Sequence, residues 1–292
     1  MALVTKIVDL TGKTVYYGCN EIRSFDELVK HYEYTETIKR SNYRCSNGSH
    51  LMIYLWNWGD LKMGITNVQS NIDISTGFAY PKSKIWAHRV NSPEQANVKK
   101  KLFDGIEVDL AYDIDSGELF VSHDVEKDKM RLTFRQYLQM VDNPGDVYYW
   151  LDVKNLYDNA DAICDTILSL AELYGFGNRF FVESWDGGAL KKARTKGIMT
   201  SLWVDNMAEK SNPDTAQWLN KYSRIIADVN PDALSAEYRM WHPLTRFFPE
   251  MNIHLWHTPA DFTVENANLT REMCHDGHVK VVLVDYDKSI SY

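Results

Sequence analysis

The sequence predicts a (β/α)8 barrel (a TIM barrel) preceded by a small N-terminal extension, and three observations support this fold. From about residue 83 onward, short apolar segments of strand character alternate with segments of helical character, which is typical of βαβ units and a parallel sheet. Eight such strand segments can be placed, and eight strands close a barrel. Polar residues follow these strands, at the ends where barrel enzymes carry their active sites. The alternative, a doubly wound open sheet, normally carries a Gly-rich phosphate turn that is not found here.

The predicted elements follow one another along the chain with short connections. The strands lie near 83–87, 105–110, 147–153, 179–184, 198–204, 232–236, 251–256 and 279–284. The helical segments between them are 93–103, 132–142, 158–174, 187–196, 214–228, 241–249 and 265–275. The residues expected at the carboxyl ends of the strands include His88, Asp109, Lys154, Ser184, Asp205, Glu237, Trp256 and Asp285. A barrel would bring these side chains together at one face.

Residues 1–82 do not continue this alternation, and we expect them to form a small α+β extension packed on the barrel of residues 83–292. Segments 14–18 and 50–68 have strand character, and segment 24–33 has the pattern of a short helix that begins at a serine N-cap.

Composition excludes several functional classes. The 292 residues carry 32 basic and 40 acidic side chains, a net charge of −8, which argues against general nucleic-acid binding. No apolar run approaches the roughly 18 residues of a transmembrane segment. The start of the chain lacks the apolar core and cleavage site of a signal peptide, and the four cysteines are scattered without a CxxC pair. We therefore expect a cytoplasmic protein with reduced thiols; the sequence leaves the oligomeric state open.

Charged residues of alternating spacing occur in two of the predicted strands. Residues i and i+2 of a strand face the same side, about 6.5–7 Å apart, so Glu107 and Asp109 present two carboxylates side by side. Asp152 and Lys154 repeat this spacing in the next strand. Buried like charges repel strongly unless one is protonated or a cation neutralises them. A hard divalent ion with oxygen ligands is the natural cation, so the pattern predicts a metal site.

The order of these residues resembles the glycerophosphodiester phosphodiesterases, whose relatives include sphingomyelinase D type phospholipases and the phosphatidylinositol phospholipase C superfamily. The features that carry the resemblance are His-Arg at 88–89, Glu-x-Asp at 107–109, His-Asp at 123–124 and Asp-x-Lys at 152–154. The resemblance runs from about residue 83 to the end and is strongest over 84–155. Weaker similarities are FFVESWD (180–186), HLWHT (254–258) and VLVDYD (282–287).

Two departures from the family pattern affect the interpretation. The glycine that usually follows His-Arg is Val90, and the third acidic ligand, glutamate in many phosphodiesterases, is Asp152. The second departure and the LYDNA run at 156–160 favour the sphingomyelinase D like branch. Only 28 residues separate His123 from Asp152, which leaves no room for the insertion typical of glycerophosphodiesterases.

The resemblance implies a metal-dependent phosphodiesterase acting on a small-molecule or lipid-headgroup phosphodiester, with His/His acid–base chemistry. The implied metal ligands are Glu107, Asp109 and Asp152, and the implied ion is Mg²⁺ or Ca²⁺. The implied catalytic residues are His88 as the base and His123 as the acid, and the implied substrate-binding residues are Arg89, Lys154 and Trp256. In this family the attacking group is often the substrate's own neighbouring hydroxyl, which gives a cyclic phosphate.

Other interpretations remain open at this point. A non-catalytic barrel that binds a phosphate-bearing ligand or a protein partner is supported by Val90 in place of glycine. A metal-dependent lyase or hydrolase acting on something other than a lipid headgroup is the second alternative. A zinc site is disfavoured because the spacing of the C-terminal histidines matches no structural zinc site; they are His242, His254, His257, His275 and His278.

Overall fold

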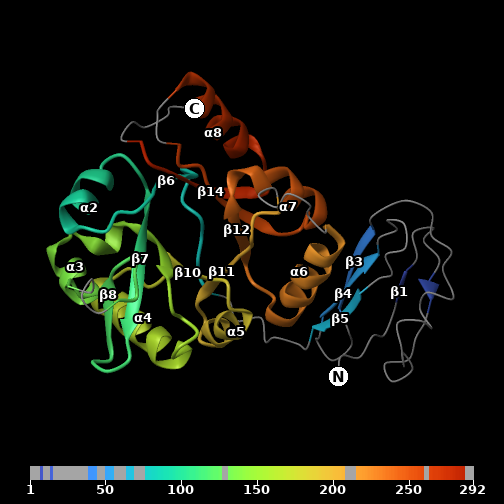
Figure 1. Cartoon of the computed structure of the whole chain (residues 1–292), viewed down its shortest axis with the longest axis horizontal. Helices are drawn as coiled ribbons and strands as arrows, with labels where there is room; N and C mark the ends of the chain where they lie inside the picture. The colour runs from blue at the N-terminus through green and yellow to red at the C-terminus, as the bar shows by residue number, and fades with distance from the viewer. Residues whose placement is uncertain are drawn as a thin grey trace. The chain divides into compact units, whose positions relative to one another are not determined.

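The structure is a computed structural model that describes the side chains of residues 76–126, 131–207, 215–259 and 263–286, and the backbone of five earlier strands. The chain divides into two compact units, Met1–Ile74 with Lys210–Asn230, and Ser75–Glu209 with Pro231–Tyr292 (Figure 1). None of the described helices is long and apolar enough to cross a membrane.

The described residues of the first unit form antiparallel strands and helix α6 (Thr215–Val229). Strand β1 (Ile7–Val8) pairs with β2 (Thr14–Val15), and β3 (Lys39–Arg44), β4 (His50–Leu55) and β5 (Gly64–Val68) form a sheet in that order. Helix α6 (Thr215–Val229) belongs to this unit and contacts β5. The predicted helix at 24–33 lies outside the described residues. The packing of residues 1–82 on the barrel stays a prediction.

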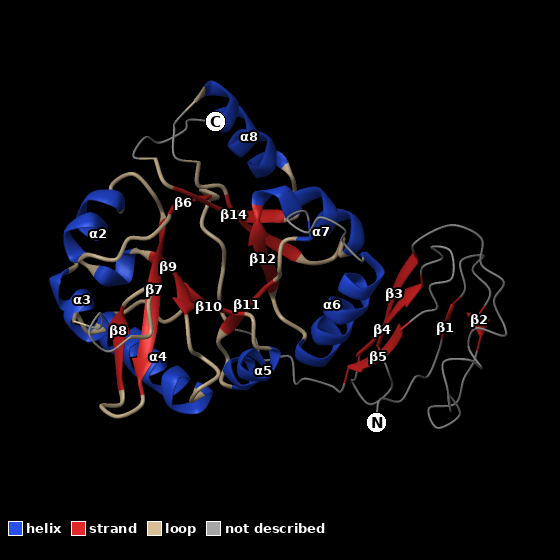
Figure 2. Cartoon of the chain, in the orientation of Figure 1, coloured by secondary structure: helices blue, strands red, loops and turns tan. Residues whose placement is uncertain are grey.

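The second unit is the (β/α)8 barrel that the sequence predicts. Its parallel strands are β6 (Ile85–Ala87), β7 (Gly105–Asp113), β9 (Tyr148–Val153), β10 (Phe180–Ser184), β11 (Met199–Trp203), β12 (Ala233–Glu237), β13 (Asn252–Trp256) and β14 (Val279–Val284). Each pairs with the next, and β14 pairs back with β6, so the sheet is closed. The unit's helices lie outside the strands (Figure 2): α2 (Pro93–Lys99), α3 (Phe134–Met140), α4 (Ala160–Tyr174), α5 (Gly187–Thr195), α7 (Trp241–Phe247) and α8 (Val264–His275).

Five of the described helices begin at a polar residue that stabilises the first turn. The side chains of Ser92, Thr133, Asn159, Asp186 and Thr263 each accept a hydrogen bond from the backbone N–H three residues later. Each such N-cap contributes about 1 kcal/mol.

A short strand that the sequence analysis did not predict extends the barrel on one side. Strand β8 (Glu118–Val121) pairs antiparallel with the far end of β7, which runs on to Asp113 beyond the barrel ladder. The turn between them is closed by Asp113, whose carboxylate accepts from the N–H and hydroxyl of Ser116, and by Gly117 with a φ of 71°. This hairpin delivers His123 to the rim of the barrel.

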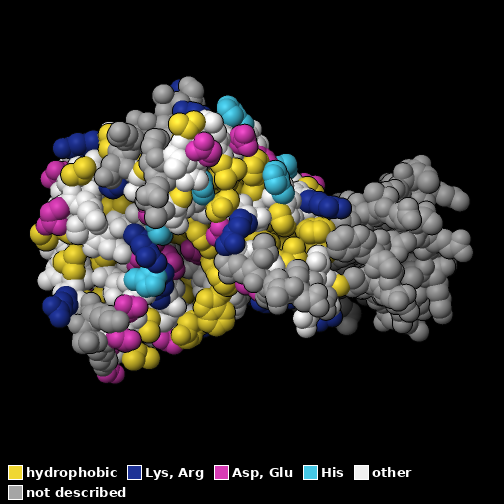
Figure 3. All heavy atoms as spheres, turned by 45° about the horizontal axis from the view of Figure 1, so that its top comes forward, with side chains coloured by type: hydrophobic (Ala, Val, Ile, Leu, Met, Phe, Trp, Pro, Cys, Tyr) yellow, Lys and Arg dark blue, Asp and Glu magenta, His cyan; other side chains and the backbone are white. Residues whose placement is uncertain are grey.

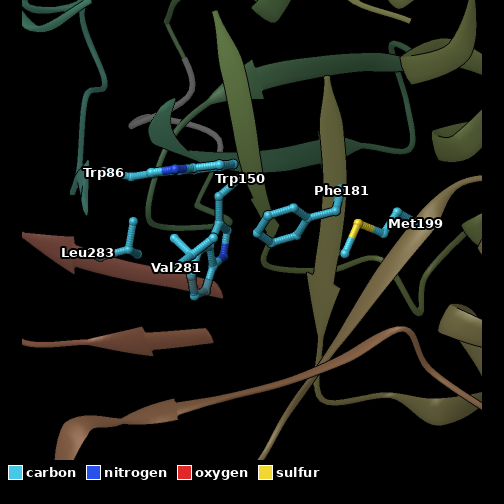
Figure 4. Close-up of a cluster of buried hydrophobic side chains, with 6 residues drawn as sticks. All are labelled: Trp86, Trp150, Phe181, Met199, Val281 and Leu283. Atoms are coloured by element: carbon cyan, nitrogen blue, oxygen red, sulfur yellow. The ribbon is translucent and has the colours of Figure 1, made fainter. Parts of the chain in front are cut away.

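The barrel interior contains a cluster of buried hydrophobic side chains from five of its strands, β6, β9, β10, β11 and β14 (Figure 4). They are Trp86, Trp150, Phe181, Met199, Val281 and Leu283. The indole of Trp86 lies against Gly105, where a Cβ atom would come within 2.1 Å of the ring, so this packing requires glycine. Such a filled interior leaves the strand ends as the place for a site.

Candidate active site

The three predicted metal ligands lie together at the carboxyl ends of two neighbouring strands. Asp109 of β7 pairs in register with Asp152 of β9, and Glu107 lies two residues earlier on β7. One oxygen of each carboxylate lies within 4.8 Å of the other two. Glu107 and Asp109 are 2% and 1% exposed, so both acidic groups have lost most of their contact with water. In the described part of the chain, this is the one group of three side chains suited to hold a metal.

Lys154 joins two of these carboxylates. Its Nζ lies 2.6 Å from Oδ1 of Asp109 and 2.5 Å from Oδ2 of Asp152. Although burial opposes its charge, the two carboxylates raise the pKa of Lys154. The structure thus places the ammonium group on two of the predicted metal ligands, and the side chain also lines the pocket described below.

The carboxylates carry more negative charge than Lys154 can balance. Burial and the neighbouring Asp109 and Asp152 raise the pKa of Glu107 well above its usual value. Burial also raises the pKa of Asp152, although Lys154 opposes this shift. Asp109 differs: burial disfavours its charge, yet Lys154 and a hydrogen bond from Asn91 hold its pKa below the usual value. Three hard oxygen donors that repel one another fit a divalent cation such as Mg²⁺ or Ca²⁺.

The turn after β6 fixes the orientation of both β7 carboxylates. The backbone N–H of Arg89 donates to Oε2 of Glu107 at 2.6 Å. The amide of Asn91 donates to Oδ2 of Asp109 at 2.7 Å, and its carbonyl accepts from the backbone N–H of Asp109 at 3.0 Å. Asn91 is not among the residues that the sequence patterns indicate; the only signal for it in the sequence is its position three residues after His88. Hydrogen bonds of this kind orient metal ligands and tune their basicity.

Arg89 in this turn has a left-handed backbone conformation, with a φ of 49°. Residues other than glycine seldom adopt this conformation. Val90 lies outside that region; its side chain is buried, and its N–H donates to the carbonyl of Glu107 at 2.9 Å. The position where the family usually has glycine therefore accepts a branched side chain here. A strained backbone at a site is kept only where the surroundings fix it, and here the bonds to Glu107 do so.

His88 is oriented by a carboxylate from the last strand of the barrel. Its Nδ1 lies 2.7 Å from Oδ1 of Asp285, which follows β14, and its Nε2 lies 4.0 Å from Oε2 of Glu107. The hydrogen bond from His88 lowers the pKa of Asp285. An ionised Asp285 accepts the Nδ1 proton, so the lone pair of a neutral His88 is on Nε2, the nitrogen near Glu107.

His123 lies at the rim, on the loop that follows β8. Its side chain is half exposed, and its Nε2 lies 3.0 Å from the Nη2 of Arg89. A guanidinium group only donates, so Nε2 accepts and the proton of a neutral His123 is on Nδ1. Nδ1 in turn lies 3.5 Å from a carboxylate oxygen of Asp124.

One pocket of about 150 Å³ joins most of these groups. Its lining combines charged residues with aromatic ones: His88, Arg89, Glu107, Asp109, Trp150, Asp152, Lys154, Glu183, Trp203, Trp256 and Leu283. Trp256 thus lines the pocket at the end of β13, and Trp203, which the sequence analysis did not select, lines it at the end of β11. Figure 3 shows a face of the barrel unit where histidine, basic and acidic side chains gather beside hydrophobic ones.

Glu183, on β10, adds a fourth carboxyl group to the pocket wall. It is 5% exposed, and it accepts hydrogen bonds from the indole of Trp150 at 2.7 Å and from the hydroxyl of Ser235. Burial, and next the charge of Asp152, raise the pKa of Glu183 to about 8. A pKa of about 8 means that the carboxyl group of Glu183 is mainly protonated at neutral pH, whereas Lys154 and Asn91 favour the ionised form of Asp109.

This pKa predicts how stability depends on pH in the metal-free protein. Between the usual pKa of a glutamate and about 8, the folded state keeps the Glu183 proton while the unfolded state loses it. The free energy of unfolding should therefore fall as pH rises from about 5 to about 8, by up to about 1.4 kcal/mol per pH unit. In Glu183→Gln this fall should be smaller. Urea unfolding in excess chelator at several pH values measures it, with the exposed Glu172→Gln as the control. A variant curve parallel to that of the wild type would contradict the assignment.

The C-terminal histidines do not form a site in the structure. His254 is buried inside the barrel, bonded to Ser201 at 2.9 Å and to Tyr80 at 3.0 Å, and burial lowers its pKa to about 3. His257 contacts Thr270. His278 precedes β14 and bonds to Asp276, at the end of the strands opposite to the pocket.

Solved structures with a similar fold include proteins described as glycerophosphodiester phosphodiesterases. A proposed glycerophosphoryl diester phosphodiesterase from Silicibacter pomeroyi is 12% identical, with a TM-score of 0.54, over 73% of this chain and 93% of that one. A proposed enzyme of the same kind from Galdieria sulphuraria is 14% identical, with a TM-score of 0.52, over 72% and 97%. A phosphodiesterase from Oleispira antarctica, solved with its product sn-glycerol-3-phosphate, is 12% identical, with a TM-score of 0.51, over 72% and 95%.

No protein-family model and no curated protein sequence matches the chain. At these low identities the structural likeness establishes the fold. The fold expected from the sequence resemblance is thereby confirmed, and the preference for the sphingomyelinase D like branch stays a prediction.

Proposed function

We propose that this protein is a metal-dependent phosphodiesterase that cleaves a glycerophosphodiester or a phospholipid-headgroup type of phosphodiester. The observation that carries the proposal is the meeting of three carboxylates, two histidines and two cationic side chains at one end of the barrel. The fold that the chain shares with phosphodiesterases, one of them solved with sn-glycerol-3-phosphate, supports the substrate class.

Glu107, Asp109 and Asp152 would hold Mg²⁺ or Ca²⁺. When bound, the ion would neutralise these carboxylates and polarise a phosphoryl oxygen of the substrate. The positive charge of Arg89 and Lys154 would bind the remaining phosphate oxygens, with the planar guanidinium able to make two parallel bonds.

His88 would act as the general base. Asp285 holds its Nδ1 proton at 2.7 Å, so Nε2 can take the proton of the attacking hydroxyl while the carboxylate stabilises the imidazolium that forms. His123 would act as the general acid for the leaving oxygen. Its Nε2 accepts from Arg89 in the structure. An anionic phosphate would compete with His123 for Arg89, which would leave Nε2 open to carry the proton that is donated.

The proposal also specifies which group attacks the phosphorus atom. Where the substrate carries a hydroxyl next to the diester, we expect that hydroxyl to attack and release a cyclic phosphate, because an internal nucleophile has a large effective molarity. The absence of a long insertion between His123 and Asp152 supports an open site in which a substrate group can take this position.

A panel of phosphodiesters incubated with Mg²⁺ or Ca²⁺, or with excess chelator, tests the proposal when products are followed by phosphorus NMR. We expect metal-dependent cleavage, with a cyclic phosphate as the first product of substrates that carry a neighbouring hydroxyl. In ¹⁸O-water, early product with ¹⁸O on phosphorus would show direct attack by water instead. Binding of such ligands without turnover in any of them would favour the non-catalytic barrel.

A further inference from the structure

The β7–β8 hairpin extends beyond the carboxyl ends of the neighbouring barrel strands, and His123 follows its second strand. The ladder between β7 and β9 ends at Leu110 and Val153, and the N–H of Lys154 makes the last backbone bond of this edge, to the carbonyl of Leu110 at 2.8 Å. On its other edge β7 pairs with β8 as far as Asp113. Above Leu110, the edge of β7 that faces β9 therefore needs another partner for its backbone groups.

The side chain of Asn155 is that partner. Its Oδ1 accepts from the backbone N–H of Tyr112 at 2.8 Å, and its Nδ2 donates to the carbonyl of Tyr112 at 2.8 Å. Nδ2 also donates to Oδ2 of Asp158 at 2.9 Å. Asn155 is 5% exposed, so water does not substitute for these bonds. An amide group that binds both the N–H and the C=O of one residue reproduces the bonding of a strand residue in a ladder.

We propose that Asn155 is a positioning residue for His123: its side chain supplies the missing rung of the β7–β9 ladder and holds the β7–β8 hairpin so that His123 meets Arg89 at the pocket rim. The inference rests on the proposed function, in which His123 protonates the leaving oxygen.

The path from Asn155 to His123 is short and consists of described contacts. Tyr112, held by Asn155, is paired with Leu119 on β8. Two residues after the end of that strand comes His123, and the intervening Ser122 donates its N–H to the carbonyl of Asp109 at 3.0 Å. Loss of the Asn155 rung leaves the N–H and C=O of Tyr112 unpaired in a buried position, which favours movement of the hairpin.

The leaving group of the substrate provides a readout that a purely structural role would not affect. A p-nitrophenolate leaves without protonation, whereas an alkoxide needs an acid. We expect the same selectivity in Asn155→Ala and in Asn155→Asp, whose carboxylate cannot donate to the carbonyl of Tyr112 or to Asp158. In both variants, kcat for an alkyl diester should fall at least about 10-fold more than kcat for the p-nitrophenyl diester with the same remaining group. Asn252→Ala is the matched control, because it removes an asparagine bond to the carbonyl of Asp232 at the opposite end of the barrel. It should show no such selectivity.

Hydrogen exchange tests the structural half of the inference without any turnover. Backbone amides of Tyr112 and of residues 118–121 should exchange faster in both Asn155 variants, and at the wild-type rate in Asn252→Ala. Wild-type exchange in the hairpin of Asn155→Ala would overturn the inference.

His123→Ala, measured with the same two substrates, separates this inference from the proposed function. If His123→Ala selectively loses the alkyl diester and the Asn155 variants lose both substrates equally, the positioning role is wrong and the proposed function stands. If His123→Ala shows no leaving-group selectivity, the acid role itself fails and the inference fails with it.

Discussion

Replacing His88 by alanine should lower kcat for phosphodiester cleavage at least about 100-fold, with little change in thermal stability. The substitution removes the proposed base. His88 is bonded to Asp285 through Nδ1 and has Nε2, the nitrogen that would take the proton, 4.0 Å from Glu107. Asp285→Asn should lower kcat by a smaller factor, because an amide can still bond to the imidazole but does not stabilise the charged form. Steady-state rates and thermal melts measure both effects.

The control for this pair is His278→Ala, since this histidine bonds to Asp276 at the other end of β14. Its kcat should remain that of the wild type. His88→Ala and His123→Ala combined should lose far less than the product of the two single losses, because both act on one proton-transfer sequence. Near wild-type rates in both single variants would make the non-catalytic, ligand-binding barrel the better interpretation.

Removal of the metal should abolish activity, and Asp109→Asn should raise the concentration of Mg²⁺ or Ca²⁺ that restores it. Asp109 is one of the three carboxylates, and it also bonds to Lys154 and Asn91. Its replacement therefore removes a metal ligand together with its ion pair to Lys154. In the wild type, an ion present at about 100 times its Kd should stabilise the fold by about 2.7 kcal/mol. The variant should lose most of this thermal shift at the same ion concentration.

Asp161→Asn is the matched control for the charge change, because Asp161 is an exposed residue of α4 that pairs with Lys192. Its metal requirement and its thermal shift should equal those of the wild type. Full activity of the wild type in excess chelator, together with no thermal shift on adding either ion, would show that the three carboxylates are not a metal site.

The sequence by itself determines most of the barrel and the core of the site, because these depend on short-range patterns. The period of the apolar residues predicts the strands and helices that the structure contains, and a spacing of two within a strand places Glu107 beside Asp109. The family resemblance indicates Asp152 as the third ligand, whereas its position opposite Asp109 is given by the register of β7 and β9 in the structure. The helix predicted at 93–103 is shorter in the structure: α2 ends at Lys99, and hydrogen-bonded turns connect it to β7.

Only the tertiary structure decided which side chains support these residues. His88 and Asp285 are 197 positions apart, and they meet because the closed sheet places β14 beside β6. Strand β8 has four residues, too few to show a clear period, yet it determines where His123 lies. The spacing of two places Lys154 on the same side of its strand as Asp152, but only the pairing of β7 with β9 brings Asp109 to the same ammonium group. Contacts between distant segments depend on how the barrel closes, which local periodicity does not encode.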